Sequence, residues 1–229
     1  MQRIVQAPPP PRLTTLRNQN ATFDEVKADG ILRWVLFEQQ RGRCAYCERP
    51  LRRPDHIEHK TKIEHFHPQN SDHWNEACQQ ESGASDDFKA PTTWSNLLLC
   101  CDGNESVTLA KTCDTSKSNT DICSEFRNPR AWHSILLVHI SRDGRALPDP
   151  ALPDGAIGIV NNVLNLNEKE LVAARRQIGL ALKNEILAKS GRKPYGLSPS
   201  KRANIIARLR ERGLSQPYGS TYLSVAELL

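Results

Sequence analysis

Apolar positions near the N-terminus follow a helical spacing. They begin after a Thr-x-x-Glu capping box at Thr22 and continue towards Gly42, and Gly30 weakens the middle of the pattern. The run of four prolines at 8–11 predicts an extended chain before this helix. We therefore expect residues 1–42 to form an extended segment followed by one helix.

The middle of the chain has short apolar runs between polar stretches. The segment 55–70 mixes β-compatible residues with histidines, and 94–101 is an apolar run short enough for a strand. The polar, aperiodic stretches 71–89 and 102–112 predict loops, and a helix is expected to start at Asp114. This part of the chain is therefore expected to hold two short strands and a helix.

The last third of the chain combines a hairpin pattern with helical patterns. An apolar run over 135–141 leads into Asp143-Gly144, which indicates a tight turn between two strands. Helical spacing follows from Asn167, over 204–212 up to Gly213, and over 221–229. The whole pattern predicts an α+β fold with helical flanks. It predicts three parts: an N-terminal segment and helix over 1–42, a central core over 43–130, and a hairpin with helices over 131–229.

Length and composition fit a globular protein with a buried core. The chain has 229 residues, and its mean hydropathy is −0.57. No apolar run approaches the roughly 18–20 residues of a membrane span, and the N-terminus lacks the apolar region of a signal peptide. We therefore expect no membrane association and a cytoplasmic location. The net charge of +5 is compatible with a polyanionic partner such as nucleic acid, but it is weak evidence alone.

Four of the seven cysteines form two pairs. Cys44 and Cys47 are separated by two residues, and Cys101 and Cys113 follow further along the chain. In a cytosolic chain such a set favours metal binding over disulfides, and four thiolates are a preferred ligand set for structural Zn²⁺. Cys100 is adjacent to Cys101, and neighbouring strand residues face opposite sides, so only one of them is expected to bind. A zinc ribbon without catalytic chemistry has the same signature.

Between and after the cysteine pairs lie the residue types that phosphodiester hydrolysis needs. His65 can act as a general base, and Glu64 beside it can hold a hard cation such as Mg²⁺ or Mn²⁺. Asp114, at the start of the expected helix, can supply a second carboxylate to that ion. Asn96 is expected to hydrogen-bond within the loop and to fix the orientation of His65. Lys117, one turn after Asp114, can face the phosphate.

Two features of this set leave alternatives open. On a flat strand Glu64 and His65 would face opposite sides, so a shared site requires a local twist or bulge. His59 has the same Ile-Glu-His context as His65, but Lys-Thr-Lys follows it, which is typical of a solvated stretch. Arginines flank the first cysteine pair and can hold backbone phosphates, Arg43 first among them.

These motifs, in this order, resemble the HNH (ββα-metal) nucleases, and within them the PtuB-like nucleases of Septu-type anti-phage systems. The similarity covers roughly residues 1–130 and includes the sequences GRCAYCE, IEHF, WSNLLLCCDGN and TCDTSKSN, at 42–48, 63–66, 94–104 and 112–119. On the family pattern Glu64, His65 and Asn96 take the acid, base and asparagine places. Cys101 is the favoured ligand because it lies five residues after Asn96, the usual HNH spacing.

The resemblance implies a ββα-metal core with a structural zinc site and a separate catalytic ion. It also implies an endonuclease, with DNA the favoured substrate, that works with an ABC/SMC-like ATPase subunit in anti-phage defence. Asp114 departs from the His or Asn of generic HNH proteins, so Asn119 is an alternative third residue. A stand-alone restriction-type nuclease and a non-catalytic zinc module are the competing functions. The C-terminal helices are expected to serve partner docking or nucleic-acid contact.

Overall fold

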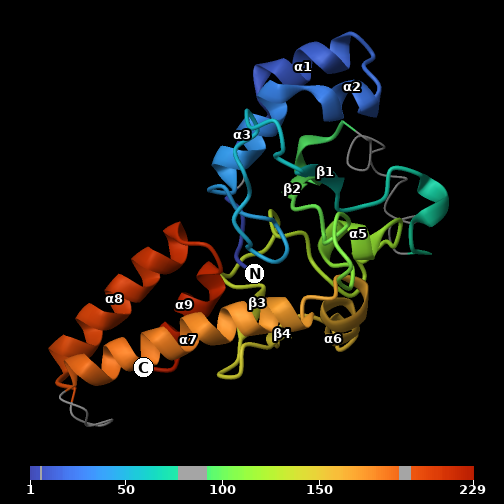
Figure 1. The fold of residues 1–229 in the computed structure, drawn as a ribbon. Coiled ribbons are helices and arrows are strands. Elements are labelled where there is room, and N and C mark those ends of the chain that lie inside the picture. The colour runs from blue at the N-terminus through green and yellow to red at the C-terminus, as the bar shows by residue number, and fades with distance from the viewer. Residues whose placement is uncertain (6, 77–91, 191–196) are drawn as a thin grey trace.

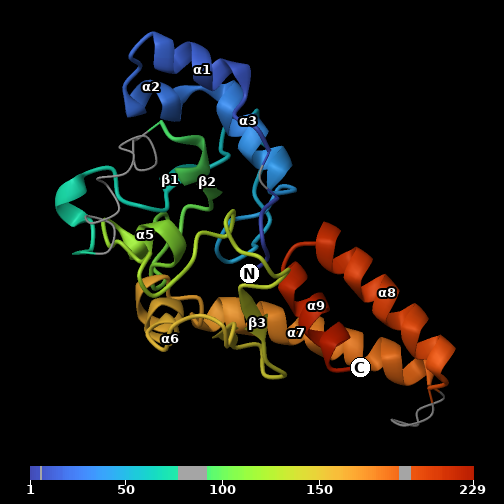
Figure 2. The same cartoon turned by 180° about the vertical axis from the view of Figure 1, so that it is seen from behind.

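The computed structural model describes residues 1–5, 7–76, 92–190 and 197–229. The fold is mixed α+β, with helices at both ends and two small antiparallel sheets between them (Figure 1). Figure 2 shows from the opposite side that the N-terminal helices and the C-terminal helices lie at opposite ends of the molecule. The prediction of an α+β fold with helical flanks is confirmed at this level.

Three helices form the N-terminal end: α1 (Pro11–Asn18), α2 (Phe23–Ala28) and α3 (Gly30–Gln39). The capping box at Thr22 is present, but the single predicted helix is divided, because Asp29 leaves the helical conformation and its carboxylate accepts from the Leu32 amide to cap α3. The proline run does not stay extended throughout. Pro11 occupies the first turn of α1, where its missing N–H costs no hydrogen bond.

The central part carries the short strands β1 (Lys62–His65) and β2 (Leu97–Cys100) and the helix α5 (Cys113–Lys117). The strands pair antiparallel, with Glu64 opposite Leu98 and His65 opposite Leu97. Single 3₁₀ turns cover Ser71–His73 and Trp94–Asn96. Most of the predicted loop over 71–89 lies outside the described residues.

The C-terminal part begins with the predicted hairpin, β3 (Val138–Ile140) and β4 (Ala146–Pro148). After α6 (Ala156–Gly158) and a π-helical turn (Ile159–Val163), three helices follow: α7 (Lys169–Lys189), α8 (Pro199–Ser215) and α9 (Gly219–Glu227). Gly213 does not end α8 as predicted. A Cβ there would lie 2.7 Å from Leu223 Cγ, so glycine allows α9 to pack against α8. No helix within the described residues is long and apolar enough to cross a bilayer.

Among the described residues, buried apolar side chains form three clusters. The first extends from Met1 through Phe66 and Phe126 to Leu171 and includes the cysteines. The second packs α1 and α3 on one face of the β1–β2 sheet, and the third joins α7, α8 and α9. Residues from all three predicted segments therefore share the first cluster, so the segments pack as neighbours around one core.

Candidate metal centre and adjoining cavity

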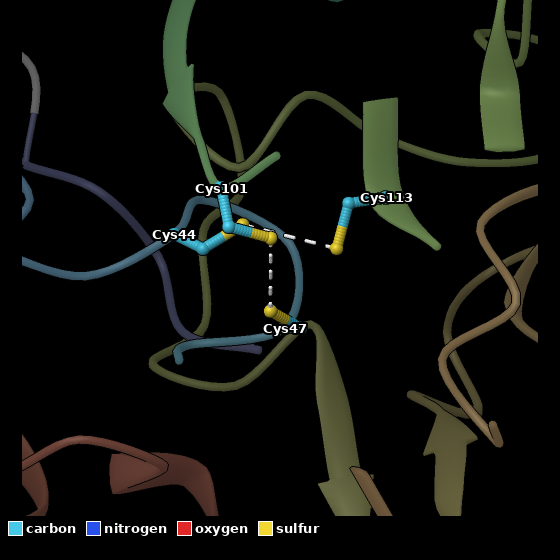
Figure 3. Close-up of side chains that lie close together, drawn as sticks. All are labelled: Cys44, Cys47, Cys101 and Cys113. Carbon is cyan, nitrogen blue, oxygen red and sulfur yellow. Dashed lines mark hydrogen bonds between the residues drawn. The ribbon is translucent and has the colours of Figure 1, made fainter. Parts of the chain in front are cut away.

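Cys44, Cys47, Cys101 and Cys113 converge on one buried point (Figure 3). Their four sulfurs lie within 4.8 Å of one another, and the Cys44–Cys113 and Cys47–Cys101 Sγ distances are both 3.8 Å. A tetrahedral zinc site with bonds of about 2.3 Å has sulfur–sulfur edges of about 3.8 Å. The cluster therefore has the donor chemistry and the spacing that Zn²⁺ requires.

Cys101, and not Cys100, belongs to this cluster. Cys100 is buried too, but it stands at the end of β2 opposite Lys62, and the next residue is the one that faces the other sulfurs. The loop that follows returns to the same place, because the Thr112 amide donates to the Gly103 carbonyl at 3.0 Å. Gly103 has φ +58°, and a Cβ there would lie 2.3 Å from the Thr112 carbonyl oxygen, so this turn requires glycine.

Two arginines lie where they can balance the cysteine cluster. Four thiolates on Zn²⁺ leave a net charge of −2. Burial favours the neutral form of Arg49, but the thiolates of Cys47 and Cys101 outweigh burial and raise its pKa. Arg175 of α7 is buried, donates to the Leu166 carbonyl at 2.6 Å and also interacts with the Cys47 thiolate. Arg175, although it belongs to a helix expected to contact a partner or nucleic acid, therefore lies inside the molecule near the cysteine cluster.

A second group of side chains lines an open cavity of about 690 Å³ between α2, β1 and α5. The residues predicted for catalysis that line it are Glu64, His65, Asp114 and Lys117, and the alternative Asn119 lines it as well. His59 is not among the lining residues; its Nδ1 accepts from the Thr61 amide at 3.1 Å. The structure thus brings together most of the predicted catalytic set and leaves His59 outside it.

Glu64 is the buried acid of this cavity. Its Oε1 lies 2.9 Å from Lys117 Nζ and accepts from Tyr46 Oη at 3.2 Å, and its carboxyl also hydrogen-bonds Asp114. Burial raises the pKa of Glu64 well above its ordinary value; Lys117 opposes this effect and Asp114 adds to it. The two carboxyls are oxygen donors within hydrogen-bond distance of one another, which is the kind of ligand that a hard cation prefers.

His65 reaches the cavity without a bulge. The β1–β2 register is unbroken from Lys62 to His65, so Glu64 and His65 face opposite sides of the strand, and the His65 ring lies 4.2 Å from the Phe23 ring. The register leaves no bulge in this strand. Both side chains still line the cavity because it extends along β1 as far as Lys62.

Asn96 holds the backbone just after His65. It is buried, its Oδ1 accepts from the His67 amide at 2.8 Å, and its Nδ2 donates to the His67 carbonyl at 3.0 Å. The Asn96 carbonyl also accepts from the Phe66 amide. Asn96 therefore fixes the path of residues 66–67 and, through it, the position of His65 at the end of β1.

Neither cation predicted to contact phosphate is available for that role. Lys117 is 1% exposed and donates to the His65 carbonyl at 3.0 Å in addition to its contact with Glu64. Arg43 donates to the carbonyls of Gly213 and Gln216 near the end of α8, so its guanidinium joins the first cysteine turn to the C-terminal helices. Both side chains therefore act as internal connections.

Other cations, which the sequence interpretation missed, line the cavity. Lys62 and Lys27 are among its lining residues. Lys62 forms an ion pair with Glu105 at 2.8 Å and donates a hydrogen bond to the Thr115 hydroxyl. The position of Lys62 could have been predicted from the alternation of side chains along β1. Lys62 lies two residues before Glu64 and hence on the same face of the strand. Tyr46 had no such signal, since its contact with Glu64 depends on how the cysteine turn packs on β1.

Comparison with known proteins gives no relative from which a role could be transferred: no family model, no curated protein and no solved structure matches the chain. A function can therefore be inferred only from the residues of the cysteine cluster and the cavity. These are a buried four-cysteine cluster that can bind a metal, and beside it a cavity with an imidazole and two carboxyls.

Proposed function

We propose that the protein is a metal-dependent HNH-type endonuclease that hydrolyses phosphodiester bonds of nucleic acid, with DNA the favoured substrate. The observation that carries this proposal is a cavity lined both by His65 and by the hydrogen-bonded carboxyls of Glu64 and Asp114. The order of the motifs, which resembles that of the PtuB-like HNH nucleases, supports the same reaction.

In this proposal His65 accepts a proton from the attacking water, since an imidazole titrates near neutral pH. Glu64 and Asp114 hold the catalytic divalent ion, which supplies charge neutralisation at the phosphate when it is bound. Asn96 keeps the backbone after His65 in place. Lys62 and Lys27, at the cavity wall, contact the nucleic-acid backbone in place of Lys117 and Arg43.

The same resemblance supports work in anti-phage defence as the nuclease subunit of a complex with an ABC/SMC-like ATPase. The C-terminal helices offer a surface for such a partner, because a mainly apolar cavity of about 430 Å³ opens between β3, α7 and α9. Leu180 and Leu228 line it and are 48% and 61% exposed. We assign partner docking to this face.

A non-catalytic zinc module is the second candidate, and one observation favours it. Glu64 already contacts Lys117 and Tyr46, so its carboxylate is satisfied within the protein. A module of this kind would retain the cysteine cluster and show no cleavage.

A cleavage assay separates the two candidates. The full chain is incubated with plasmid, phage DNA and RNA in Mg²⁺, with and without a co-expressed ATPase, beside His65→Ala and the matched variant His59→Ala. We expect Mg²⁺-dependent cleavage that falls by about 100-fold or more in His65→Ala, because general-base catalysis contributes about 10²–10⁴-fold, and that is unchanged in His59→Ala. Cleavage only with the ATPase supports the complex, and full activity without it supports a stand-alone nuclease.

Two outcomes contradict the nuclease proposal. One is the absence of metal-dependent cleavage of any of the three substrates by the wild type in the presence of the ATPase. The other is undiminished cleavage by a His65→Ala protein that is folded and retains zinc, since His65 would then not be the base. The zinc content and the unfolding midpoint of both variants are measured in parallel, so a loss of activity is not mistaken for a loss of fold.

A further inference from the structure

A second group of potential metal ligands lies apart from the four cysteines. His67, Asp121 and Cys123 bring a ring nitrogen, a carboxylate oxygen and a sulfur within 4.8 Å of one another. The side chains of His67 and Asp121 are only 5% and 1% exposed, and His67 Nδ1 lies 3.5 Å from Asp121 Oδ1. The proposed function uses none of these three side chains.

The sulfur of this group can act as a thiolate ligand only when Cys123 is reduced. Cys123 is disulfide-bonded in the structure, and a disulfide sulfur is not a thiolate ligand. We propose that reduction of this disulfide creates a second zinc site, in which the Cys123 thiolate, the His67 imidazole and the Asp121 carboxylate bind one Zn²⁺. This inference does not depend on the nuclease assignment.

The chemistry of the step balances with a two-electron reductant such as a phosphine. The S–S bond breaks as two electrons pass from phosphorus to the two sulfurs, water supplies both thiol protons, and its oxygen leaves as the phosphine oxide. The Cys123 thiol then releases its proton as the thiolate binds Zn²⁺. Oxidation of the two thiols to the disulfide removes the sulfur ligand and reverses the process.

The geometry around the three donors suits zinc. Bonds of about 2.0–2.1 Å to nitrogen and oxygen in a tetrahedron place these two atoms about 3.3 Å apart, close to the observed 3.5 Å. Thiolate, imidazole and carboxylate together are ligands that Zn²⁺ accepts, and three of them leave one position open for water. The proposed site is therefore of the three-ligand kind and differs from the closed four-cysteine cluster.

Asn75 supplies the supporting contacts that such ligands need. Its backbone amide donates to Asp121 Oδ2 at 3.2 Å, and its Nδ2 donates to Cys123 Sγ at 3.2 Å. The Cys123 amide donates to Asp121 Oδ1 at 3.2 Å. Hydrogen bonds to ligand atoms orient them and tune their basicity, so part of the supporting shell is already in place.

The proposed zinc site lies close in sequence to His65, which lines the cavity. His67 follows His65 by two residues, and both of its backbone groups are held by Asn96. Zinc on the His67 ring would fix the side chain of a segment whose backbone is already fixed. Redox state and zinc supply would thereby act on the segment that ends β1.

Zinc stoichiometry tests the proposal without any activity assay. The full-length protein is prepared with the Cys123 disulfide intact, verified by peptide mass mapping, and after reduction with a phosphine. Each sample is loaded with Zn²⁺, dialysed and analysed for zinc per chain. We expect about one zinc in the oxidised protein and about two in the reduced protein. A value of one in both states, or of two in both, overturns the proposal.

Substitutions assign the second zinc to its ligands. In reduced protein, His67→Ala, Asp121→Asn and Cys123→Ser should each lower the zinc content to about one per chain. The matched controls Asp72→Asn and His73→Ala, at exposed residues, should leave it at about two. Retention of two zinc ions by all three ligand variants overturns the assignment. If a variant fails to fold, the wild type alone decides through alkylation of Cys123, read by peptide mass. Added Zn²⁺ should slow this alkylation severalfold, and equal rates with and without zinc overturn the proposal.

Discussion

At the residue scale, Lys117 has a consequence for stability. Its ammonium lies in the interior, 2.9 Å from Glu64 Oε1, and donates to the His65 carbonyl. Removing Lys117 leaves the Glu64 oxygen and the His65 carbonyl buried without their donor, and each such loss costs about 1–3 kcal/mol. We predict that Lys117→Met lowers the free energy of unfolding by about 2 kcal/mol or more, measured by urea titration without added Mg²⁺ or Mn²⁺.

The control for this prediction is Lys27→Met, at an exposed cation of the same cavity, with an expected change within about 0.5 kcal/mol. The double variant Lys117→Met/Glu64→Gln should lose less than Lys117→Met alone, because an amide at this position carries no charge and has a hydrogen-bond donor of its own. An effect of Lys117→Met as small as that of Lys27→Met would show that the ion pair is not buried as described.

Asn96 gives a second prediction at this scale. Asn96→Ala leaves the buried amide and carbonyl of His67 without their partners, and each such loss costs about 1–3 kcal/mol. We expect the free energy of unfolding to fall by about 2 kcal/mol or more, and cleavage to fall with it, since the segment after His65 is released. Asn119→Ala, at an exposed asparagine of the same cavity, is the matched control and should change stability little. Equal effects of the two substitutions would contradict the role of Asn96.

At the element scale, the start of α3 depends on Asp29. Burial raises the pKa of this carboxyl, but the Leu32 amide and Arg12, 2.7 Å away, outweigh burial and lower it. Because the folded-state pKa is the lower one, the charged cap stabilises the protein fully above the unfolded-state pKa of about 3.9. This contribution is lost as the pH falls through the folded-state value. Asp29→Ala should cost about 1–2 kcal/mol at neutral pH.

The neutral isostere separates the cap from the charge. Asp29→Asn can still accept from the Leu32 amide but cannot pair with Arg12, so it should lie between wild type and Asp29→Ala at neutral pH. Wild type and Asp29→Asn should converge in unfolding midpoint as the pH drops below about 3.9. A difference that stays constant from neutral to acid pH would contradict the ionised cap.

The elements also show what the sequence can and cannot predict. Helical spacing and turn residues predicted the hairpin and the C-terminal helices, because these signals are local. The break at Asp29 was missed although its signal is local, since Asp29 caps a new helix through the Leu32 amide. The packing of Gly213 against Leu223 was missed because it depends on how α8 and α9 pack. The same division applies to the site. Cysteine spacing, together with the position of Cys101 after Asn96, predicted the four-cysteine cluster that can bind a metal. The internal role of Lys117, in contrast, follows only from the packing of α5 on β1.

At the scale of the whole molecule, the cysteine cluster lies in the largest apolar core, which extends from Met1 to Leu171. Without a metal, the four buried sulfurs would meet inside this core with no ion to hold them together, so metal removal should unfold much of the chain cooperatively. We predict that a strong zinc chelator lowers the unfolding midpoint by more than about 10 °C, as does Cys44→Ser.

Cys100→Ser is the matched control, because Cys100 is buried beside the cluster but is not one of its four sulfurs. It should retain the zinc of the four-cysteine site, measured by metal analysis. Loss of this zinc in Cys100→Ser, or a Cys44→Ser protein that stays folded and metal-free with an unchanged midpoint, would show that the ligand set is wrong.

The helix α7 belongs to two cores, since its Leu171 packs in the cluster of the cysteines and its Leu182 packs with α8 and α9. Arg43 adds a second connection between the cysteine turn and the end of α8. A C-terminal region with these contacts to the core cannot be exchanged between proteins as an independent module. Recombination between related genes near position 131 would bring together halves whose interfaces were never selected together. New partners should therefore be acquired by gradual substitution on the outer faces of these helices, while their inner faces diverge in step with the metal centre.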